Sequence, residues 1–235
     1  MFPRYYRMLD FDYAIFDLDG TLLDYELESH EAIKSVCEKY GGDKFTVELH
    51  ASIIGTKNEF WSRKIICDLG LTDRVTPEQF VHEYHVIMES ACERMQLLPG
   101  AEKLLRNLKM RNIPIAIATS STRNMVEKKL RYHSVFAECV DAIVTGDDPA
   151  VINGKPAPDI FIEAARRIAR SSIYDKKRFV VFEDSPHGIL GGYRAGMQTV
   201  AIPDARFHPF MSSENREIFQ KHADCVITSL DDFIV

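Results

Sequence analysis

The chain contains 235 residues, of which 46% are hydrophobic and 27% are charged. This composition is that of an ordinary globular protein, and it excludes a disordered or fibrous chain. The 35 acidic and 29 basic side chains give a net charge of −6, so the overall field repels nucleic acid and anionic membrane surfaces. We therefore expect no nucleic-acid and no membrane partner, and an anionic ligand would need a local binding site.

The cysteines are too scattered to predict a disulfide framework or a zinc site, because no two of them form a CxxC pair. They are Cys37, Cys67, Cys92, Cys139 and Cys225. The apolar runs fall far below the ~18 residues of a membrane-spanning helix, and residues 1–12 lack the apolar core of a secretory signal. We therefore expect free thiols and a cytoplasmic location.

The first predicted element is a strand at residues 13–16, which ends directly before Asp17. Residues 25–97 then show only helical patterns, at 28–40, 58–68 and 77–95. From there on, predicted helices and strands alternate. The helices are at 101–110, 124–132, 159–169 and 186–195, and the strands at 113–118, 142–144, 179–182 and 199–202.

This order of elements predicts an α/β fold with an inserted helical domain. The apolar runs are continuous rather than alternating, which is typical of parallel strands covered on both faces. Alternation of such strands with helices indicates a doubly wound parallel sheet of the Rossmann-like type. We therefore expect a core formed by residues 1–24 and 98–235, and a helical cap formed by residues 25–97. The two chain crossings between them could act as a hinge.

Polar residues follow three of the predicted strands directly. They are Asp17, Asp19, Thr119, Ser120, Glu183 and Asp184. Ligands of open α/β sheets bind beyond the carboxyl ends of the strands, so these residues are expected to converge there. Clustered carboxylates repel one another, and a shared proton or a hard divalent cation relieves this repulsion. Among the cations, magnesium fits best because it prefers oxygen ligands and retains waters. Lys155, in a loop that two prolines stiffen just before a predicted helix, could supply a fixed positive charge.

The same residues resemble the four motifs of the haloacid dehalogenase superfamily. These are FDLDGTL at residues 16–22, ATS at 118–120, GKP at 154–156 and FEDS at 182–185. The helical insertion is similar to the small cap of that superfamily. Further segments, at residues 98–104, 146–149 and 154–161, resemble the branch that contains pseudouridine-5'-phosphatase. The resemblance implies a magnesium-dependent phosphomonoester hydrolase whose partner is a small phosphorylated metabolite, such as a nucleoside or polyol monophosphate.

The resemblance also assigns catalytic roles. Asp17 would be the nucleophile that forms an aspartyl-phosphate, and Asp19 would protonate the leaving alkoxide and then deprotonate the attacking water. The phosphoryl oxygens would be held by Thr119, the backbone N–H of Ser120, and Lys155.

For the metal, the resemblance implies Mg²⁺ bound by the Asp17 carboxylate, the Asp19 backbone carbonyl and Asp184. Glu183 would orient a metal-bound water more readily than bind the metal itself. Both residues of the Glu183–Asp184 pair thus belong to the expected metal site.

Substrate specificity is expected in the cap. Residues 54–57 resemble the specificity loop of the superfamily, so Thr56 and Lys57 are candidates, together with Trp61. Core packing is the competing interpretation for Trp61. A role for His187 near the site competes with a capping or surface role. We expect a monomer or a weak homodimer.

Two other functions compete with a phosphatase. Sugar phosphate mutases of the β-phosphoglucomutase type often have a cap histidine twelve residues after the nucleophile, where this chain has Ser29. His30 follows one residue later, about 100° further round a helix. A catalytically silent binding module is the second alternative, although every chemically required position is filled.

Overall fold

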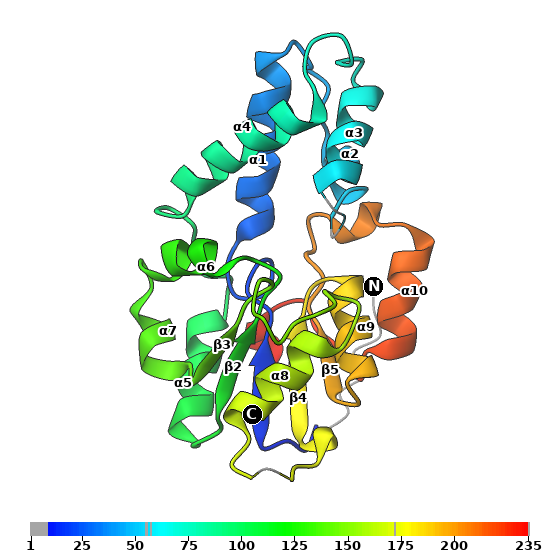
Figure 1. Cartoon of the computed structure of the whole chain (residues 1–235). Coiled ribbons are helices and arrows are strands. Elements are labelled where there is room, and N and C mark those ends of the chain that lie inside the picture. The colour runs from blue at the N-terminus through cyan, green and yellow to red at the C-terminus, as the bar shows by residue number, and fades with distance from the viewer. Residues whose placement is uncertain (1–8, 55, 57, 172, 235) are drawn as a thin grey trace.

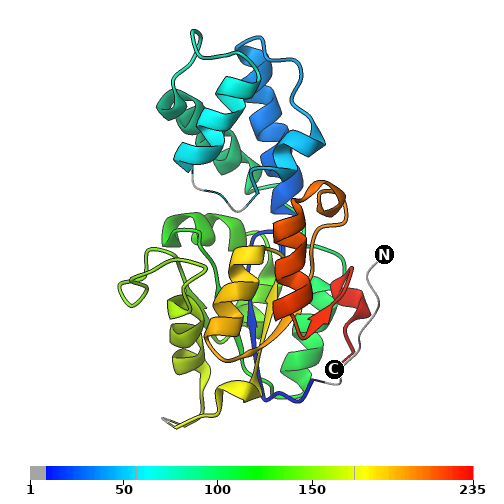
Figure 2. The same ribbon diagram turned by 90° about the vertical axis from the view of Figure 1, so that its right-hand side faces the viewer.

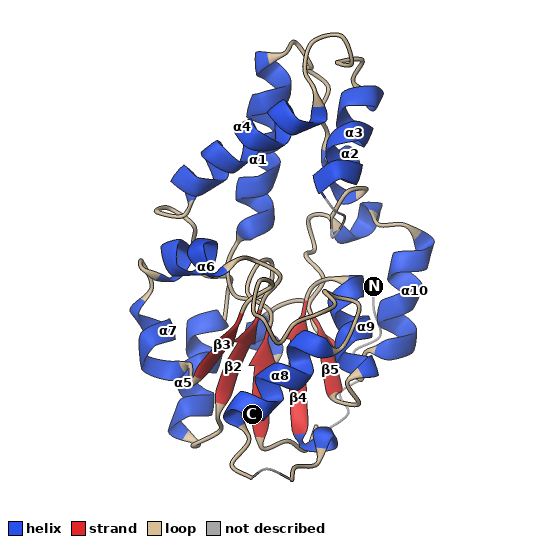
Figure 3. Ribbon diagram, in the orientation of Figure 1, coloured by secondary structure: helices blue, strands red, loops and turns tan. Residues whose placement is uncertain are grey.

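A computed structural model describes residues 9–54, 56, 58–171 and 173–234. Its centre is a sheet of six parallel strands in the order β3-β2-β1-β4-β5-β6 (Figures 1 and 3). The strands are β1 (Tyr13–Phe16), β2 (Ile115–Ala118), β3 (Ala142–Val144), β4 (Phe179–Glu183), β5 (Gln198–Ala201) and β6 (Cys225–Val226). The predicted α/β class with a parallel sheet is confirmed.

Helices cover both faces of this sheet. Successive side chains of each strand point to opposite sides, so an apolar strand presents an apolar surface to the helices on each face. In β1, Ala14 and Phe16 pack in the cluster that includes the buried face of α5, whereas Ile15 packs in the cluster that includes α8. The core helices are α5 (Ala101–Met110), α6 (Arg123–Leu130), α7 (Ser134–Cys139), α8 (Asp159–Ile168), α9 (Pro186–Arg194) and α10 (Ser213–His222).

Some elements were missed from the sequence because they are short or polar. They are β6, which has only two residues, the brief helices α2 (Val47–Ala51) and α7, the polar helix α10, and three 3-10 turns. The turns are η1 (Lys176–Arg178), η2 (His208–Phe210) and η3 (Leu230–Asp232). Such segments carry too little periodic apolar pattern to predict an element.

Four helices stand together beyond the carboxyl ends of the strands (Figures 1 and 2). They are α1 (Tyr25–Lys39), α2, α3 (Asn58–Asp68) and α4 (Pro77–Ala91). Ile33, Trp61 and Phe80 are buried among these helices, in an apolar cluster that continues into the α/β core. The two chain crossings run side by side, because Asp24 N–H donates to the Gln96 carbonyl at 2.8 Å. In the part of the chain that the structure describes, no helix is long and apolar enough to cross a bilayer.

Candidate active site

The central strands bring the predicted polar residues to one place. β1 pairs with both β2 and β4, so Asp17, Thr119 and Glu183 come from three adjacent strand ends (Figure 3). A cavity of 610 Å³ lies there between the core and the cap. Its core wall includes all seven predicted core residues, namely Asp17, Asp19, Thr119, Ser120, Lys155, Glu183 and Asp184. The tertiary structure thus brings these seven residues together.

Asp17 is a buried carboxylate with a buried lysine against it. Its side chain forms an ion pair with Lys155, whose Nζ also lies 2.6 Å from Oε1 of Glu183. Burial raises the pKa of Asp17 to about 7; the Lys155 ammonium opposes this rise, and the charges of Glu183 and Asp19 add to it. For Lys155, burial favours the neutral form, but Asp17 and Glu183 outweigh it and raise the pKa of the ammonium above its usual range. Lys155 therefore stays charged beside the expected nucleophile.

Glu183 is fixed from its other side by the start of α9. Its Oε2 accepts hydrogen bonds from the backbone N–H and the hydroxyl of Ser185, both at 2.9 Å. A Cβ at Gly188 would lie 1.8 Å from this carboxyl group, so the helix can approach Glu183 only with glycine there. The carboxylate that was expected to orient a metal-bound water thus also forms a direct ion pair with Lys155.

Asp184 lies against the loop that follows β1. Its Oδ1 accepts a hydrogen bond from the Thr21 hydroxyl at 3.1 Å, and a Cβ at Gly20 would lie 2.4 Å from its Oδ2. Gly20 has a φ of +88°, a backbone conformation that glycine adopts readily. Burial, followed by the charges of Glu183 and Asp17, raises the pKa of Asp184 well above its usual value. The two carboxylates, Asp17 and Asp184, therefore repel each other in a desolvated site.

This repulsion and the donor set fit a magnesium ion. Asp17 and Asp184 would supply carboxylate oxygens, and the backbone carbonyl of Asp19 would come from the loop after β1. Among the residues that the structure describes, no three His, Cys, Asp or Glu side chains form a complete metal cluster. A site of two carboxylates and one carbonyl leaves the remaining positions to water and phosphate, as magnesium prefers.

Asp19 has partners that the sequence did not indicate. Lys129 Nζ lies 2.7 Å from each of its carboxylate oxygens, and the Ser121 hydroxyl donates to Oδ2 at 2.6 Å. Lys129 comes from α6, where it shares the buried side with Val126, three residues earlier. A lysine at a position where a helix pattern expects an apolar residue is the one signal that could have suggested it.

Thr119 and Ser120 occupy different positions at the cavity. Thr119 is buried, and its hydroxyl accepts a hydrogen bond from the Ser121 N–H at 3.1 Å, which tightens the turn after β2. Ser120 is exposed at the cavity surface. A Cβ at Gly146 would lie 2.3 Å from the Ser120 carbonyl oxygen, so the loops after β2 and β3 touch backbone to backbone.

The cap wall of this cavity differs from the predicted specificity residues. It is formed by Tyr25, Glu26, Ile54, Asn58, His85, Met88 and Glu89. Thr56 and Trp61 instead line an adjoining cavity of 130 Å³ inside the cap, which shares Tyr25, Glu26, Ile54 and Asn58 with the catalytic cavity. The Thr56 hydroxyl donates to the Ile53 carbonyl at 2.6 Å, and the Trp61 ring packs edge-on against Phe80 and Tyr84. Lys57 lies outside the described residues.

The two histidines considered in the sequence analysis, His30 and His187, do not line the catalytic cavity. His30 stacks at a tilt on Phe45 and lies edge-on to His50, whereas His187 is exposed. Ser29, at the position of the mutase histidine, shares a hydrogen bond with the Tyr84 hydroxyl at 3.1 Å.

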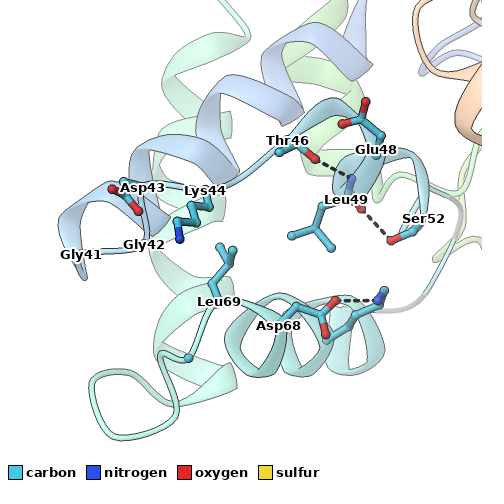
Figure 4. A pocket seen from close by; sticks show the side chains of 12 residues that line it. Gly41, Gly42, Asp43, Lys44, Thr46, Glu48, Leu49, Ser52, Asp68 and Leu69 are labelled. Atoms are coloured by element: carbon cyan, nitrogen blue, oxygen red, sulfur yellow. Dashed lines mark hydrogen bonds and ion pairs between the residues drawn. The ribbon is translucent and has the colours of Figure 1, made fainter.

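Another hollow, of 810 Å³, lies within the cap (Figure 4). It runs between the loop from Gly41 to Thr46 and the end of α3. Lys64 and Asp68 pair with each other at 2.6 Å, and the Thr46 hydroxyl accepts the Leu49 N–H at 3.2 Å. None of the predicted site residues lines this hollow, and we therefore place the candidate active site at the strand ends.

Comparisons with known proteins agree with the four motifs. A family model described as haloacid dehalogenase-like hydrolase matches residues 14–202. Over 94% of the chain, 35% of residues are identical to (DL)-glycerol-3-phosphatase 2 of Arabidopsis thaliana, of which 88% is covered. Over the same share, 36% are identical to a Drosophila melanogaster protein named "Probable pseudouridine-5'-phosphatase", of which 90% is covered. These identities are nearly equal although the names give different substrates.

The fold agrees as well. A crystal structure of a HAD family hydrolase from Deinococcus radiodurans R1, with bound phosphate and sodium, matches with a TM-score of 0.75. The two chains are 26% identical, and the match covers 94% of this chain and 93% of the other. Motifs, family model and fold thus lead to one conclusion: the chain belongs to the haloacid dehalogenase-like hydrolase family, as the sequence resemblance indicated.

Proposed function

We propose that this protein is a magnesium-dependent phosphomonoester hydrolase that acts through an aspartyl-phosphate. The observation that supports this most directly is the buried Asp17 carboxylate, paired with Lys155 at the meeting point of three strands. A carboxylate is a nucleophile without first losing a proton, and a fixed ammonium beside it can receive the negative phosphoryl oxygens. The phosphatase names of the two relatives are consistent with this chemistry.

The reaction requires two displacements at phosphorus. In the first, an Asp17 oxygen forms a bond to phosphorus, the bond to the ester oxygen breaks, and the leaving alkoxide takes a proton from Asp19. In the second, a water oxygen attacks the same phosphorus, Asp19 takes the water proton, and Asp17 leaves as a free carboxylate. Lys155, Thr119 and the backbone at Ser120 hold the phosphoryl oxygens through both steps.

Magnesium would be held by the Asp17 carboxylate, the Asp184 carboxylate and the Asp19 backbone carbonyl. When bound, it supplies positive charge that offsets the repulsion between the phosphate and the nucleophile. Asp17 must be ionised to attack, and any cation that relieves its repulsion from Asp184 also favours the ionised form.

We further propose that the substrate is a nucleoside or polyol monophosphate, such as pseudouridine 5'-phosphate or glycerol 3-phosphate. The cap wall of the cavity carries hydrogen-bonding groups at Glu26, Asn58, His85 and Glu89. Among the described cap residues that line it, none is Lys or Arg. Such a wall suits a hydroxyl-bearing leaving group better than the second phosphate of a sugar bisphosphate, which disfavours a mutase.

The test is a screen of the purified protein against phosphomonoesters, with magnesium and with excess chelator. The panel contains pseudouridine 5'-phosphate, uridine 5'-phosphate, glycerol 3-phosphate, a hexose phosphate and p-nitrophenyl phosphate. We expect magnesium-dependent phosphate release, fastest with a nucleoside or polyol ester. No release from any ester would favour a silent binding module, and conversion of one sugar phosphate into another without phosphate release would favour a mutase.

Asp17→Asn is the decisive variant in this screen. We expect turnover to disappear, because an amide oxygen cannot form the covalent intermediate. The melting temperature measured without metal should stay level or rise slightly, because the change removes one charge from a crowded, desolvated cluster. Retained turnover would exclude Asp17 as the nucleophile, whereas a large fall in melting temperature would indicate a structural role.

A further inference from the structure

Lys129 is a fully buried lysine that pairs with a carboxylate inside the protein. Only 2% of its side chain is exposed. Burying an ammonium is costly unless an opposite charge and further hydrogen bonds compensate for the lost water. Asp19 provides this compensation, with both carboxylate oxygens 2.7 Å from Nζ. The pair therefore depends on a fixed geometry on both sides.

Two further groups complete the arrangement. The Ser121 hydroxyl donates to Oδ2 of Asp19 at 2.6 Å and accepts from Lys129 Nζ at 2.9 Å. Ser121 is itself held by its backbone N–H, which donates to the Thr119 hydroxyl directly after β2. On another side, the Tyr25 ring, at the start of the first cap helix, lies 4.6 Å from Nζ. Lys129 thus connects Asp19 to α6, to the end of β2 and to the beginning of the cap.

We propose that Lys129 is a positioning residue that fixes the Asp19 carboxylate in the cavity wall for proton exchange with the leaving alcohol. This inference rests on the proposed function, in which Asp19 serves as general acid and base. Asp19 lies in a loop, and without Lys129 its side chain could rotate among several rotamers. Oδ2 of Asp19 contacts both Lys129 and Ser121, and Oδ1 contacts Lys129, so the carboxyl group is held in a single orientation. This fixed orientation reduces the entropy that is lost when Asp19 meets the reacting oxygen.

The consequence depends on the leaving group. Glycerol leaves as a poor, strongly basic alkoxide that needs a proton, whereas p-nitrophenol leaves as a stabilised phenolate that hardly does. A misplaced general acid should therefore slow phosphoryl transfer from glycerol 3-phosphate much more than from p-nitrophenyl phosphate. The ratio kcat/KM reports this step without the later attack of water, which is common to both esters.

The experiment compares Lys129→Met with the unaltered enzyme on these two esters in saturating magnesium. We expect kcat/KM for glycerol 3-phosphate to fall by ~10²-fold, the cost of misplacing a catalytic group by about an ångström. The loss on p-nitrophenyl phosphate should be at least about tenfold smaller, because general-acid catalysis contributes little there. Competitive inhibition by inorganic phosphate should be unchanged, since Lys155 and not Lys129 is expected to hold the phosphoryl group.

Three further variants keep the test decisive. Ser121→Ala removes one bond to Asp19 and should shift the two esters in the same direction by ~10-fold, which tests the proposal even if Lys129→Met does not fold. In an Asp19→Asn background, Lys129→Met should change neither value of kcat/KM further. Lys109→Met removes a lysine that pairs with Asp141 at 2.9 Å outside the cavity, and it is the control for charge.

Equal losses on both esters, a parallel loss of phosphate inhibition, or full activity of Lys129→Met on glycerol 3-phosphate would overturn the role of Lys129. An unaltered enzyme that releases phosphate from no ester of the panel would overturn the proposed function instead; if pseudouridine 5'-phosphate is the better alkyl ester, it takes the place of glycerol 3-phosphate in the comparison. The two failures are therefore distinguishable.

Discussion

At the scale of single residues, the site is built from charges that are buried in pairs. Lys155 contacts Asp17 and Glu183, and Lys129 contacts Asp19, so each of the two lysines neutralises carboxylates that the chain has removed from water. Removing the lysine of such a pair leaves carboxylates uncompensated in a desolvated place, which costs more than the pair itself contributes. The neighbouring residues that hold each pair in place therefore matter for stability as much as the paired residues do.

Gly188 is the clearest of these supports. In Gly188→Ala, the new methyl group would lie 1.8 Å from the Glu183 carboxyl group and would displace it from Lys155. We expect a loss of about 1–3 kcal/mol in the free energy of unfolding, as for other overpacked sites. Turnover of p-nitrophenyl phosphate should fall as well, because Lys155 loses its second carboxylate.

Chemical denaturation and steady-state kinetics measure the two effects. Gly154→Ala is the matched control, because its added methyl group would meet no atom within 4 Å. Wild-type stability and turnover in Gly188→Ala would show that α9 can shift away from Glu183 without consequence.

At the scale of elements, the loop that contains Lys155 leads directly into α8. The contacts that anchor α8 therefore affect the position of Lys155. Glu163 of α8 accepts hydrogen bonds from Arg166 and Arg167, each at 2.7 Å. Arg167 also donates to Asp148 at 2.6 Å and to the Ile143 carbonyl of β3 at 2.9 Å. This cluster ties α8 to β3 at the edge of the sheet. It therefore holds in place the first turn of α8, into which the Lys155 loop leads.

The same cluster predicts a pH dependence of stability. The hydrogen bond from Arg166, followed by that from Arg167, lowers the pKa of Glu163 to about 2 from its usual 4.5. A lowered pKa in the folded state stabilises the protein above the unfolded value, and this contribution disappears as pH falls through the folded value. Glu163→Gln should therefore lose about 1–2 kcal/mol at pH 7, after allowance for solvent screening around the arginines.

The measurement is urea unfolding of both proteins between pH 7 and pH 2. The difference in the free energy of unfolding should be constant down to about pH 5 and should shrink below it. Glu217→Gln is the control, because Glu217 forms an exposed ion pair with Lys221 on α10. A difference that does not change with pH would mean that Glu163 acts by packing and not by charge.

At the scale of the whole molecule, recognition of the leaving group depends on how the cap faces the core. Both parts line one cavity. Under the proposed function, the core wall would hold the phosphoryl group that all phosphomonoesters share, and the cap wall would face the part that differs between them. The ion pair of Asp24 with Arg206, at 2.6 Å, holds the first chain crossing to the core. Beside it, the ring of His50 in α2 lies 4.8 Å from the ring of Phe207.

Glu26 tests this view of specificity. It lines the catalytic cavity from α1, and its Oε2 lies 2.8 Å from Nε2 of His50. In Glu26→Gln, one negative charge disappears from the wall that faces the leaving group. The ratio of kcat/KM for 3-phosphoglycerate, whose leaving alcohol carries a carboxylate, to that for glycerol 3-phosphate should rise by ~5-fold, which corresponds to ~1 kcal/mol.

Glu28→Gln is the matched control on the same helix, because Glu28 pairs with Arg94 at 2.8 Å and does not line the cavity. If both variants change the ratio equally, the effect comes from net charge and not from the cap wall. If Glu26→Gln leaves the ratio unchanged, the leaving group does not lie near Glu26.

Local patterns along the chain were enough to predict the α/β class and the six polar residues that follow strands and meet at the cavity. The reason is physical: continuous apolar runs identify buried parallel strands, and parallel strands present the residues that follow them at one edge. By contrast, Lys129 lies 110 positions from Asp19 in the chain, and no local pattern pairs them. The cap wall was equally hidden, since helix packing decided that His85 and Glu89 line the catalytic cavity whereas Thr56 and Trp61 line only the adjoining cavity inside the cap. Short-range periodicity specifies which residues are buried, but only the tertiary packing specifies which buried charges meet.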